Sequence, residues 1–136
     1  MKKIITLLLI LFGFAACNQN ETKRSETALD TGRDFIRASL NGEFKKASEL
    51  LLPDPENVQL FDSYKLFYNK LPADKKKGYK EASYEINKYL DVNDSTTLIK
   101  YSNSYMNKPM DIKLVRTNKK WWVDFKYTYS GNLPIE

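Results

Sequence analysis

The chain has 136 residues, of which 22 are Lys or Arg and 17 are Asp or Glu, and it contains one cysteine and no histidine. The lack of histidine removes the commonest general base of enzymes and the usual ligand of most zinc sites, and a single cysteine excludes an internal disulfide bond. The length suits one domain that buries roughly two thirds of its unfolded surface without metals or disulfides.

The first 16 residues predict an export signal. A basic start is followed by an apolar run over residues 4–12, which is too short to span a bilayer comfortably. The small residues Ala15 and Ala16 stand directly before the lone Cys17. This order resembles the lipobox of bacterial lipoproteins, in which the signal is cut before a cysteine that carries acyl chains. The alternative interpretation is a secreted protein with a chance cysteine at its cleavage site.

Cys17 is therefore the predicted lipidation site, and two or three acyl chains on it would hold the protein stably on a membrane. Residues 18–26 are polar, without an apolar period, and predict a flexible tether. Only Glu21 adds a negative charge close to the cysteine, which favours an anchor in the outer membrane facing the periplasm over one on the cell exterior. We expect a cell-envelope protein with a membrane partner and a single domain over residues 27–136.

The charge of the mature chain gives no sign of a nucleic-acid partner. Removal of residues 1–16 leaves 20 basic and 17 acidic residues, a net charge of +3, whereas a nucleic-acid binder needs a focused basic face. The basic run Lys75-Lys76-Lys77, with Lys80, lies in a predicted connection. A solvated loop is one interpretation of this run, and contact with an anionic lipid or glycan is the other.

The domain begins with a predicted helix. Apolar or small residues recur at helical spacing from Ala28 to Leu40, with Thr27 as the N-cap and Gly42 as a left-handed C-cap. Gly32 lies within this apolar stripe although it costs about 1 kcal/mol relative to Ala. We interpret this glycine as a sign that another backbone approaches the helix closely at this position.

Two further helices are predicted before residue 72. The second is short and ends at Pro53, and the third begins with Asp54 as its N-cap, Pro55 at its first position, and ends at Pro72. The residues expected on their inner faces are Phe44, Ala47, Leu50 and Leu51, then Val58, Phe61, Tyr64, Phe67, Tyr68 and Leu71.

The second half of the domain alternates between apolar and polar residues and predicts four antiparallel strands joined by short turns. Residues 82–90 would also suit a helix, but the β-branched residues that follow favour a strand. The residues expected to face the core are Tyr84, Ile86, Leu90 and Val92, then Ile99, Tyr101 and Tyr105, then Met110, Ile112 and Leu114, and last Trp121, Val123, Phe125 and Tyr127. Helices followed by a meander of strands predict an α+β fold.

Two segments, "ASLNGEFKKASELL" and "NKKWWVDFKY", resemble the NTF2-like, or cystatin-like, superfamily. In particular the chain is similar to small lipoproteins of unknown function from Bacteroidota-type bacteria, over about residues 27–129. The resemblance implies a curved sheet of about four strands that wraps the first helix into a cone, often around an apolar pocket. Relatives include isomerases, cyclases and dehydratases, while many others only bind or dimerise, so the fold does not fix the function.

Five aromatic residues are candidates to line the interior of such a cone: Phe35, Tyr64, Tyr101, Tyr105 and Trp121. They either enclose a small apolar ligand or simply fill the core, where a tyrosine hydroxyl finds its partner at the rim. A histidine-free enzyme of the isomerase or cyclase kind is a further alternative, and it would need an Asp or Tyr in the pocket. We expect no cofactor and no metal.

The outward side of the last predicted strand is a second candidate site. It carries Trp122, Asp124 and Lys126, and exposed tryptophans are enriched in interface hot spots. A homodimer through this sheet face is one prediction, and the alternative is that neighbouring side chains or the C-terminal tail cover Trp122. The sequence thus predicts a membrane-anchored protein with a non-enzymatic binding or interaction role.

Overall fold

The computed structural model describes residues 24–132, so the predicted export signal, Cys17 and the predicted tether up to residue 23 lie outside the described residues. Within them, five helices and a four-stranded antiparallel sheet form the predicted α+β domain. The elements are α1 (Ala28–Asn41), α2 (Phe44–Ser48), α3 (Pro55–Lys70), α4 (Ala73–Glu81), β1 (Tyr84–Asn93), β2 (Thr96–Asn103), β3 (Pro109–Thr117), β4 (Lys120–Val123) and α5 (Phe125–Asn132).

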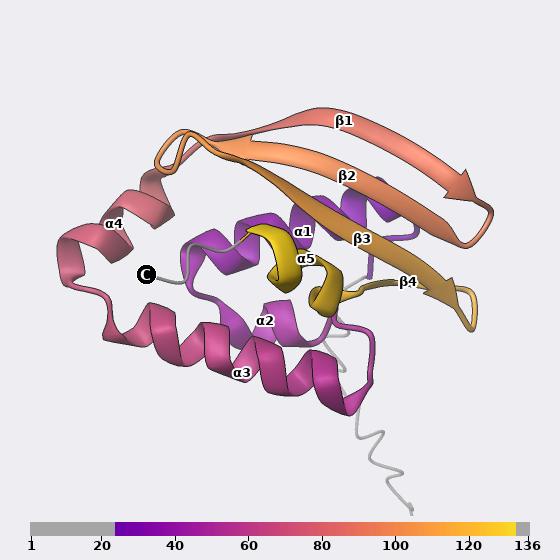
Figure 1. Ribbon diagram of the computed structural model, residues 1–136, viewed down its shortest axis with the longest axis horizontal. Helices are drawn as coiled ribbons and strands as arrows, with labels where there is room; N and C mark the ends of the chain where they lie inside the picture. Colours follow the sequence, from indigo (N-terminus) through magenta and orange to yellow (C-terminus); the bar gives the residue numbers. More distant parts are fainter. Residues whose placement is uncertain (1–23, 133–136) are drawn as a thin grey trace, which may run out of the picture.

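The sheet, in the order β1-β2-β3-β4, curves over α1, and α2 and α3 lie on the opposite side of that helix (Figure 1). Helix α4 lies at one end of the sheet, and the β3–β4 turn lies at the other end. Where β4 ends, α5 packs against β3. The helices therefore occupy the concave side of the sheet in the predicted cone-like arrangement, and the two ends of the domain differ in what closes them.

Both predicted caps of α1 are confirmed. The side-chain oxygen of Thr27 accepts a hydrogen bond of 3.1 Å from the backbone N–H of Asp30, and Gly42 has a φ of 73°. A Cβ atom at Gly32 would lie 2.7 Å from Cδ1 of Ile99. The glycine therefore allows a close approach, as predicted, but the neighbour is a side chain of β2 and not a backbone.

Helix α3 begins as predicted, because Asp54 accepts a hydrogen bond of 3.0 Å from a backbone N–H of the first turn. Phe61 and Tyr68 on its inner face are buried, whereas Val58 and Phe67 are 49% and 40% exposed. The prediction that these last two face inward is wrong. The described helices and the sheet pack on only one side of α3, and that side is narrower than the apolar pattern indicates.

Residues 84–93 form a strand, but the predicted facing of its second half is wrong. The pairing of β1 with β2 shifts by one residue between Ile86 and Lys88. An extra residue reverses the alternation of side chains beyond it. Leu90, predicted to face the core, pairs on the outer face and is 45% exposed, and a second shift leaves Val92 53% exposed.

Residues 73–81 form α4, so the predicted connection around Lys75 to Lys80 is wrong as a loop. The lysines are mainly exposed, as the solvated interpretation requires. The Nζ atom of Lys77 lies 3.7 Å from a carboxylate oxygen of Glu81, one helical turn further on. Two features of this segment are helix signals: Pro72 before the first turn and the spacing of this ion pair. The segment is too polar to show an apolar periodicity.

Strand β4 ends at Val123, and residues 125–132 form α5 instead of the predicted continuation of the strand. The backbone N–H of Lys126 donates a 2.8 Å hydrogen bond to the side-chain oxygen of the fully buried Asn57. This bond satisfies one of the free N–H groups in the first turn of the helix. Tyr127, predicted to face the core with the strand, is consequently 38% exposed.

Aromatic rings fill the centre of the domain between α1, α3 and α5. The ring of Phe61 lies 6.0 Å from Phe35, 6.0 Å from Phe44 and 5.2 Å from Phe125, measured between centroids. The rings are tilted or edge-to-face, which is the preferred geometry for aromatic pairs. Since all four side chains are 9% exposed or less, this part of the interior is closely packed.

Candidate functional site

Five tyrosine side chains lie near one another at the α4 end of the domain, and we call them the tyrosine cluster. They are Tyr64 and Tyr68 from α3, Tyr79 from α4, Tyr101 from β2 and Tyr105 from the turn after β2. The ring centroids of Tyr68 and Tyr79 are 5.9 Å apart, and those of Tyr79 and Tyr105 are 4.8 Å apart. Three otherwise separate elements therefore meet through aromatic rings.

Helix α4 contributes no fully buried residue of its own, and its Tyr79 belongs to this cluster. Gly78 leaves room for the ring of Tyr105, because a Cβ atom there would overlap it. At the end of the helix, both terminal nitrogens of Arg37 donate to the carbonyl oxygen of Ala82 at 3.2 Å. The Nζ atom of Lys76 also donates to the backbone oxygen of Asn69 at 2.7 Å, so α4 is held by ring packing and by hydrogen bonds of two basic side chains.

Tyr64 and Tyr101 lie deep in the domain. Burial raises the pKa of both phenols far above the ordinary value, and the charge that a neighbouring phenolate would carry raises it further. Tyr79, Tyr101 and Tyr68 all act on the pKa of Tyr64 in this way, so their hydroxyls are close to it. Even so, Tyr64, Tyr79 and Tyr101 keep some accessible surface. They are deep side chains that are not sealed in the core.

The hydroxyls of the cluster differ in their partners. Tyr68 donates to the backbone oxygen of Leu40 at 3.3 Å, and Tyr101 donates to the sulfur of Met110, a weak acceptor, at 3.7 Å. Among the described residues no hydrogen bond is recorded for the hydroxyl of Tyr64, and its pKa is governed by burial and nearby charge alone. The hydroxyl of Tyr64 is therefore a donor that an acceptor on a bound molecule can take.

This arrangement supplies hydrogen-bond donors and aromatic surface. Because burial raises the phenol pKa values, the hydroxyls are neutral at physiological pH and serve as donors, not as bases or nucleophiles. Within residues 24–132, no three His, Cys, Asp or Glu side chains lie together in a way that could bind a metal ion. No helix of that same stretch has the length and apolar character that a bilayer crossing requires.

The structure separates the five predicted pocket residues. Tyr64 and Tyr101 belong to the tyrosine cluster, and so does Tyr105, although β2 ends before it and the side chain is 39% exposed in the following turn. Phe35 lies in the closely packed aromatic core. Trp121 lies on β4, at the opposite end of the domain, where it pairs across the hairpin and not with the cluster.

Trp122 lies on the outer face of β4 opposite Val115, as predicted, but it is covered by Arg24. The guanidinium of Arg24 lies 3.9 Å from the centre of the Trp122 ring. Its terminal nitrogens donate to the carbonyl oxygens of Trp121 at 2.7 Å and Glu49 at 3.1 Å. We call this set the Arg24 clamp. The last residues of the predicted tether are thus fixed to the domain and cover the predicted interface residue.

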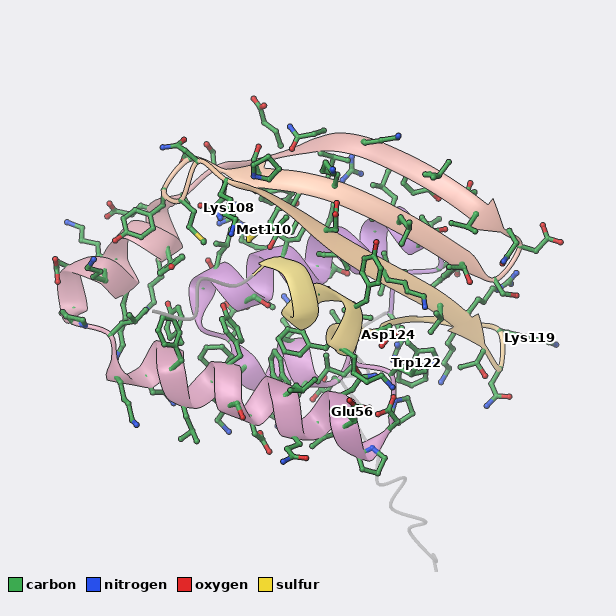
Figure 2. The ribbon with its side chains drawn as sticks, in the orientation of Figure 1. Glu56, Lys108, Met110, Lys119, Trp122 and Asp124 are labelled. Carbon is green, nitrogen blue, oxygen red and sulfur yellow. The ribbon has the colours of Figure 1, made fainter. Side chains whose placement is uncertain are left out.

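The three predicted interface residues do not form one patch. Asp124 stands between β4 and α5, with a carboxylate oxygen 3.4 Å from the Nζ atom of Lys113. Lys126 lies on α5, and its Nζ atom is 3.0 Å from a carboxylate oxygen of Asp54 at the start of α3. Figure 2 shows Trp122 and Asp124 near the β3–β4 end, with Met110 near the opposite end of the sheet. The change from strand to helix at residue 124 redirects these side chains.

A surface cleft of about 940 Å³ lies between α2 and α3, above Phe44 and Phe61. Its rim carries both signs of charge in equal number: Glu43, Glu49 and Asp62, and Lys45, Lys46 and Lys65. The rim therefore has no preference for an anionic or a cationic ligand. None of the five predicted pocket residues lines this cleft, whereas three of them belong to the tyrosine cluster, which is therefore the better candidate site.

Comparison of the chain with family models, with curated proteins and with solved structures gives no match in any of the three. The resemblance to NTF2-like lipoproteins stays a prediction from the residues. Arg24 of the clamp and Tyr79 of the tyrosine cluster were not singled out from the sequence. Only Tyr79 had a usable signal, since the helix signals around Pro72 and Glu81 place it on α4.

Proposed function

We propose that the chain is a lipid-anchored protein of the bacterial cell envelope whose domain binds a small aromatic ligand at the tyrosine cluster without transforming it. The anchor is supported by the apolar signal and the small residues before Cys17. The binding role is supported by one structural observation. The half-buried side chain of Tyr64 packs among aromatic rings, and no hydrogen bond is recorded for its hydroxyl among the described residues.

The surroundings of that hydroxyl indicate the chemistry of the ligand. The rings of Phe44, Phe61 and Phe125 lie 5.8–5.9 Å from the ring of Tyr64, and Tyr101 and Tyr79 add further aromatic surface. Such walls favour an uncharged, flat apolar body. The free phenol donor favours one hydrogen-bond acceptor on that body, for example a carbonyl oxygen.

Binding without catalysis agrees with the ionisation of the cluster. A catalytic base must release its proton near the working pH, and burial moves the pKa of Tyr64 and Tyr101 in the opposite direction. The ion pair of Lys126 with Asp54 lies at the start of α3, where it joins α5 to α3. A phenol donor can still orient a ligand and select for an acceptor.

The anchor is tested by membrane fractionation of the wild-type chain and Cys17→Ala in a bacterial host. We expect the wild type in the membrane fraction, and the variant either soluble or still carrying its signal peptide. Mass spectrometry of the mature N-terminus should show acyl chains on Cys17. Equal membrane association of two processed, unacylated proteins would contradict the anchor and would leave the binding proposal untouched.

The binding role is tested with two probes of the same shape, 2-acetylnaphthalene, which has an acceptor, and 2-ethylnaphthalene, which has none. Chemical shifts of backbone amides in a nuclear magnetic resonance titration should report binding of both near the tyrosine cluster. Tyr64→Phe should weaken binding of the acetyl probe about five- to tenfold, the value of one hydrogen bond, and leave the ethyl probe unchanged.

Tyr89→Phe is the matched control, since it removes a phenol from the exposed strand β1. It should alter neither affinity. Shifts that appear only outside the cluster, or equal effects of Tyr64→Phe on both probes, would refute the assignment of Tyr64 as the donor.

A self-contact through the sheet is a second candidate function, favoured by a different observation from the one first expected. A cleft of about 160 Å³ on the outer face is lined by Leu90, Leu98 and Tyr127, and Leu90 is 45% exposed. Analytical ultracentrifugation of the mature chain at about 100 μM should then show a dimer that Leu90→Glu converts into a folded monomer. A monomeric wild type would exclude it at that concentration.

A further inference from the structure

The β3–β4 hairpin, residues 115–122, carries charge of one sign. Arg116, Lys119 and Lys120 are exposed, and the segment contains no acidic residue. No ion pair is recorded for these three side chains among residues 24–132, although the flanking Lys113 pairs with Asp124. Lys119 stands at the tip of the hairpin, away from the rest of the domain (Figure 2). The hairpin is therefore a small basic surface.

The hairpin is joined firmly to the Arg24 clamp. Asn118 and Lys119 both have positive φ, 51° and 62°, which is the geometry of the two-residue type I′ turn. The indole N–H of Trp122 donates to the backbone oxygen of Thr117 at 3.3 Å. Arg24 stacks on that same indole. Arg24 and the basic hairpin are therefore joined as one unit.

The length of the tether limits how far this unit can lie from the anchor. Seven residue steps separate Arg24 from Cys17, and a fully extended chain spans at most about 3.6 Å per residue, or about 25 Å here. Helix α4, which carries Tyr79 of the tyrosine cluster, lies at the other end of the domain from the hairpin (Figure 1). An acylated Cys17 would therefore keep the hairpin end close to the bilayer and leave the α4 end free to turn away.

We infer that the β3–β4 hairpin rests on the anionic phospholipid headgroups of the leaflet that holds the anchor, with the tyrosine cluster facing away from the membrane. The inference rests on the lipid anchor of the proposed function. Basic side chains next to a membrane are attracted by anionic lipids, and Arg116, Lys119 and Lys120 are exposed on the hairpin for that contact. The two tryptophans beside them are partly covered, Trp122 by Arg24 and Trp121 by the core, and they serve as reporters of the position of the hairpin.

The only two tryptophans of the chain lie on this hairpin, so their fluorescence reports where it is. The acylated mature protein is placed in vesicles of phosphatidylcholine alone, or of phosphatidylcholine with 30% phosphatidylglycerol, each containing a dansyl-headgroup lipid. We expect energy transfer from tryptophan to dansyl to be about twofold greater in the anionic vesicles. Added 0.5 M salt should remove the difference, since it screens exposed charges.

The triple variant Arg116→Gln, Lys119→Gln, Lys120→Gln should reduce transfer in anionic vesicles to the value in neutral vesicles. The matched control Lys75→Gln, Lys77→Gln, Lys80→Gln removes three exposed charges from α4 and should leave transfer unchanged. Equal transfer in both kinds of vesicle, or a loss caused by the α4 variant instead, would overturn the inference. Flotation of the vesicles reports the anchor separately, because an unanchored protein fails to float whatever its orientation.

Discussion

The two ends of the domain are closed by different kinds of interaction. At the β3–β4 end, the backbone of β4 is bonded on its outer edge to the segment before α3, with Leu52 N–H to Val123 oxygen at 2.9 Å and Val123 N–H to Leu50 oxygen at 2.8 Å. Arg24 adds two further bonds to backbone oxygens. At the α4 end, aromatic rings provide much of the attachment, together with side-chain hydrogen bonds from Arg37 to Ala82 and from Lys76 to Asn69.

This difference matters because the two kinds of contact respond differently to change. A hydrogen bond has a narrow range of distance and angle, and a broken bond in a buried place costs the full desolvation of its groups. Packed rings can slide or tilt at a smaller cost, since most of their attraction comes from burial of apolar surface, which is non-directional. The β3–β4 end is thus suited to a fixed attachment, and the α4 end is suited to admit a ligand.

The largest expected effect comes from the aromatic core that both ends share. Phe61 is 2% exposed and contacts Phe35, Phe44 and Phe125. Phe61→Ala should lower the free energy of unfolding by about 3–5 kcal/mol, measured by urea denaturation. Leu66→Ala, on the exposed side of the same helix (60% exposed), should change it by less than about 0.5 kcal/mol. Similar losses for the two variants would mean that the packing side of α3 is wrong.

The next largest expected effect comes from the Arg24 clamp. Arg24→Ala removes two charge-assisted hydrogen bonds and the stacking on Trp122, and should lower the free energy of unfolding by about 2 kcal/mol. The emission maximum of the two tryptophans should also move, because both lie at the clamp. Arg24→Lys keeps the charge but lacks the planar fork, so it should recover only part of the loss. Unchanged stability and emission in Arg24→Ala would show that the clamp does not close this end.

The sequence analysis predicts the well-patterned parts of this comparison and misses the parts that depend on single long-range contacts. The caps of α1 and α3 follow from residue type and position, and the structure confirms them. The bulge in β1 and the end of β4 do not follow from alternation. The first inserts one residue without changing composition, and the second depends on Asn57, which is 69 residues away from Lys126 in the chain.

The candidate sites were predictable to a similar degree. Tyr64 and Tyr101 are identified by periodicity because they belong to regular elements that face the interior. The cover of Trp122 is not predictable in this way, since it comes from a polar tether without any pattern and was expected to be flexible. Tyr79 lies in a segment so rich in lysine that solvation dominates its interpretation. Periodicity and residue type predict helices and strands, whereas contacts between those elements decide which aromatic side chains meet.

Substitutions at two glycines test whether packing at the α4 end adapts more easily than packing in the core. A Cβ atom at Gly32 would meet Ile99, which is fully buried beneath the sheet, and one at Gly78 would overlap Tyr105, which is 39% exposed. Gly32→Ala should destabilise the domain by about 1–3 kcal/mol, because a packed core absorbs extra volume poorly. Gly78→Ala should cost less than about 1 kcal/mol, since Tyr105 can swing outward and Ala is the better helix former. Urea denaturation of both variants measures the contrast, and a greater loss for Gly78→Ala would reverse the proposed roles of the two ends.

The smallest expected effect concerns Tyr64 and depends on pH. At pH 7, Tyr64→Phe should lie within about 0.5 kcal/mol of the wild type, because no hydrogen bond of the removed hydroxyl is recorded in the described part of the chain. Tyr68→Phe, the matched control from the same helix, should lose about 1 kcal/mol with the bond to the oxygen of Leu40.

At high pH the stability of Tyr64→Phe relative to the wild type should change. The pKa of Tyr64 is raised in the folded state, so its contribution to stability is complete below about pH 10, the pKa of an unfolded phenol. Above that pH the unfolded chain releases the proton and the folded chain keeps it, and stability falls as pH rises. Tyr64→Phe removes this loss, so the wild type should unfold at lower urea than the variant above about pH 10, and the gap should widen with pH. The other phenols of the cluster still ionise on unfolding, so the variant retains a shallower decline. Parallel curves for wild type and Tyr64→Phe from pH 7 to pH 11 would mean that the Tyr64 phenol ionises as easily in the folded domain as in water, and the α4 end would then be open to solvent instead of poised to enclose a ligand.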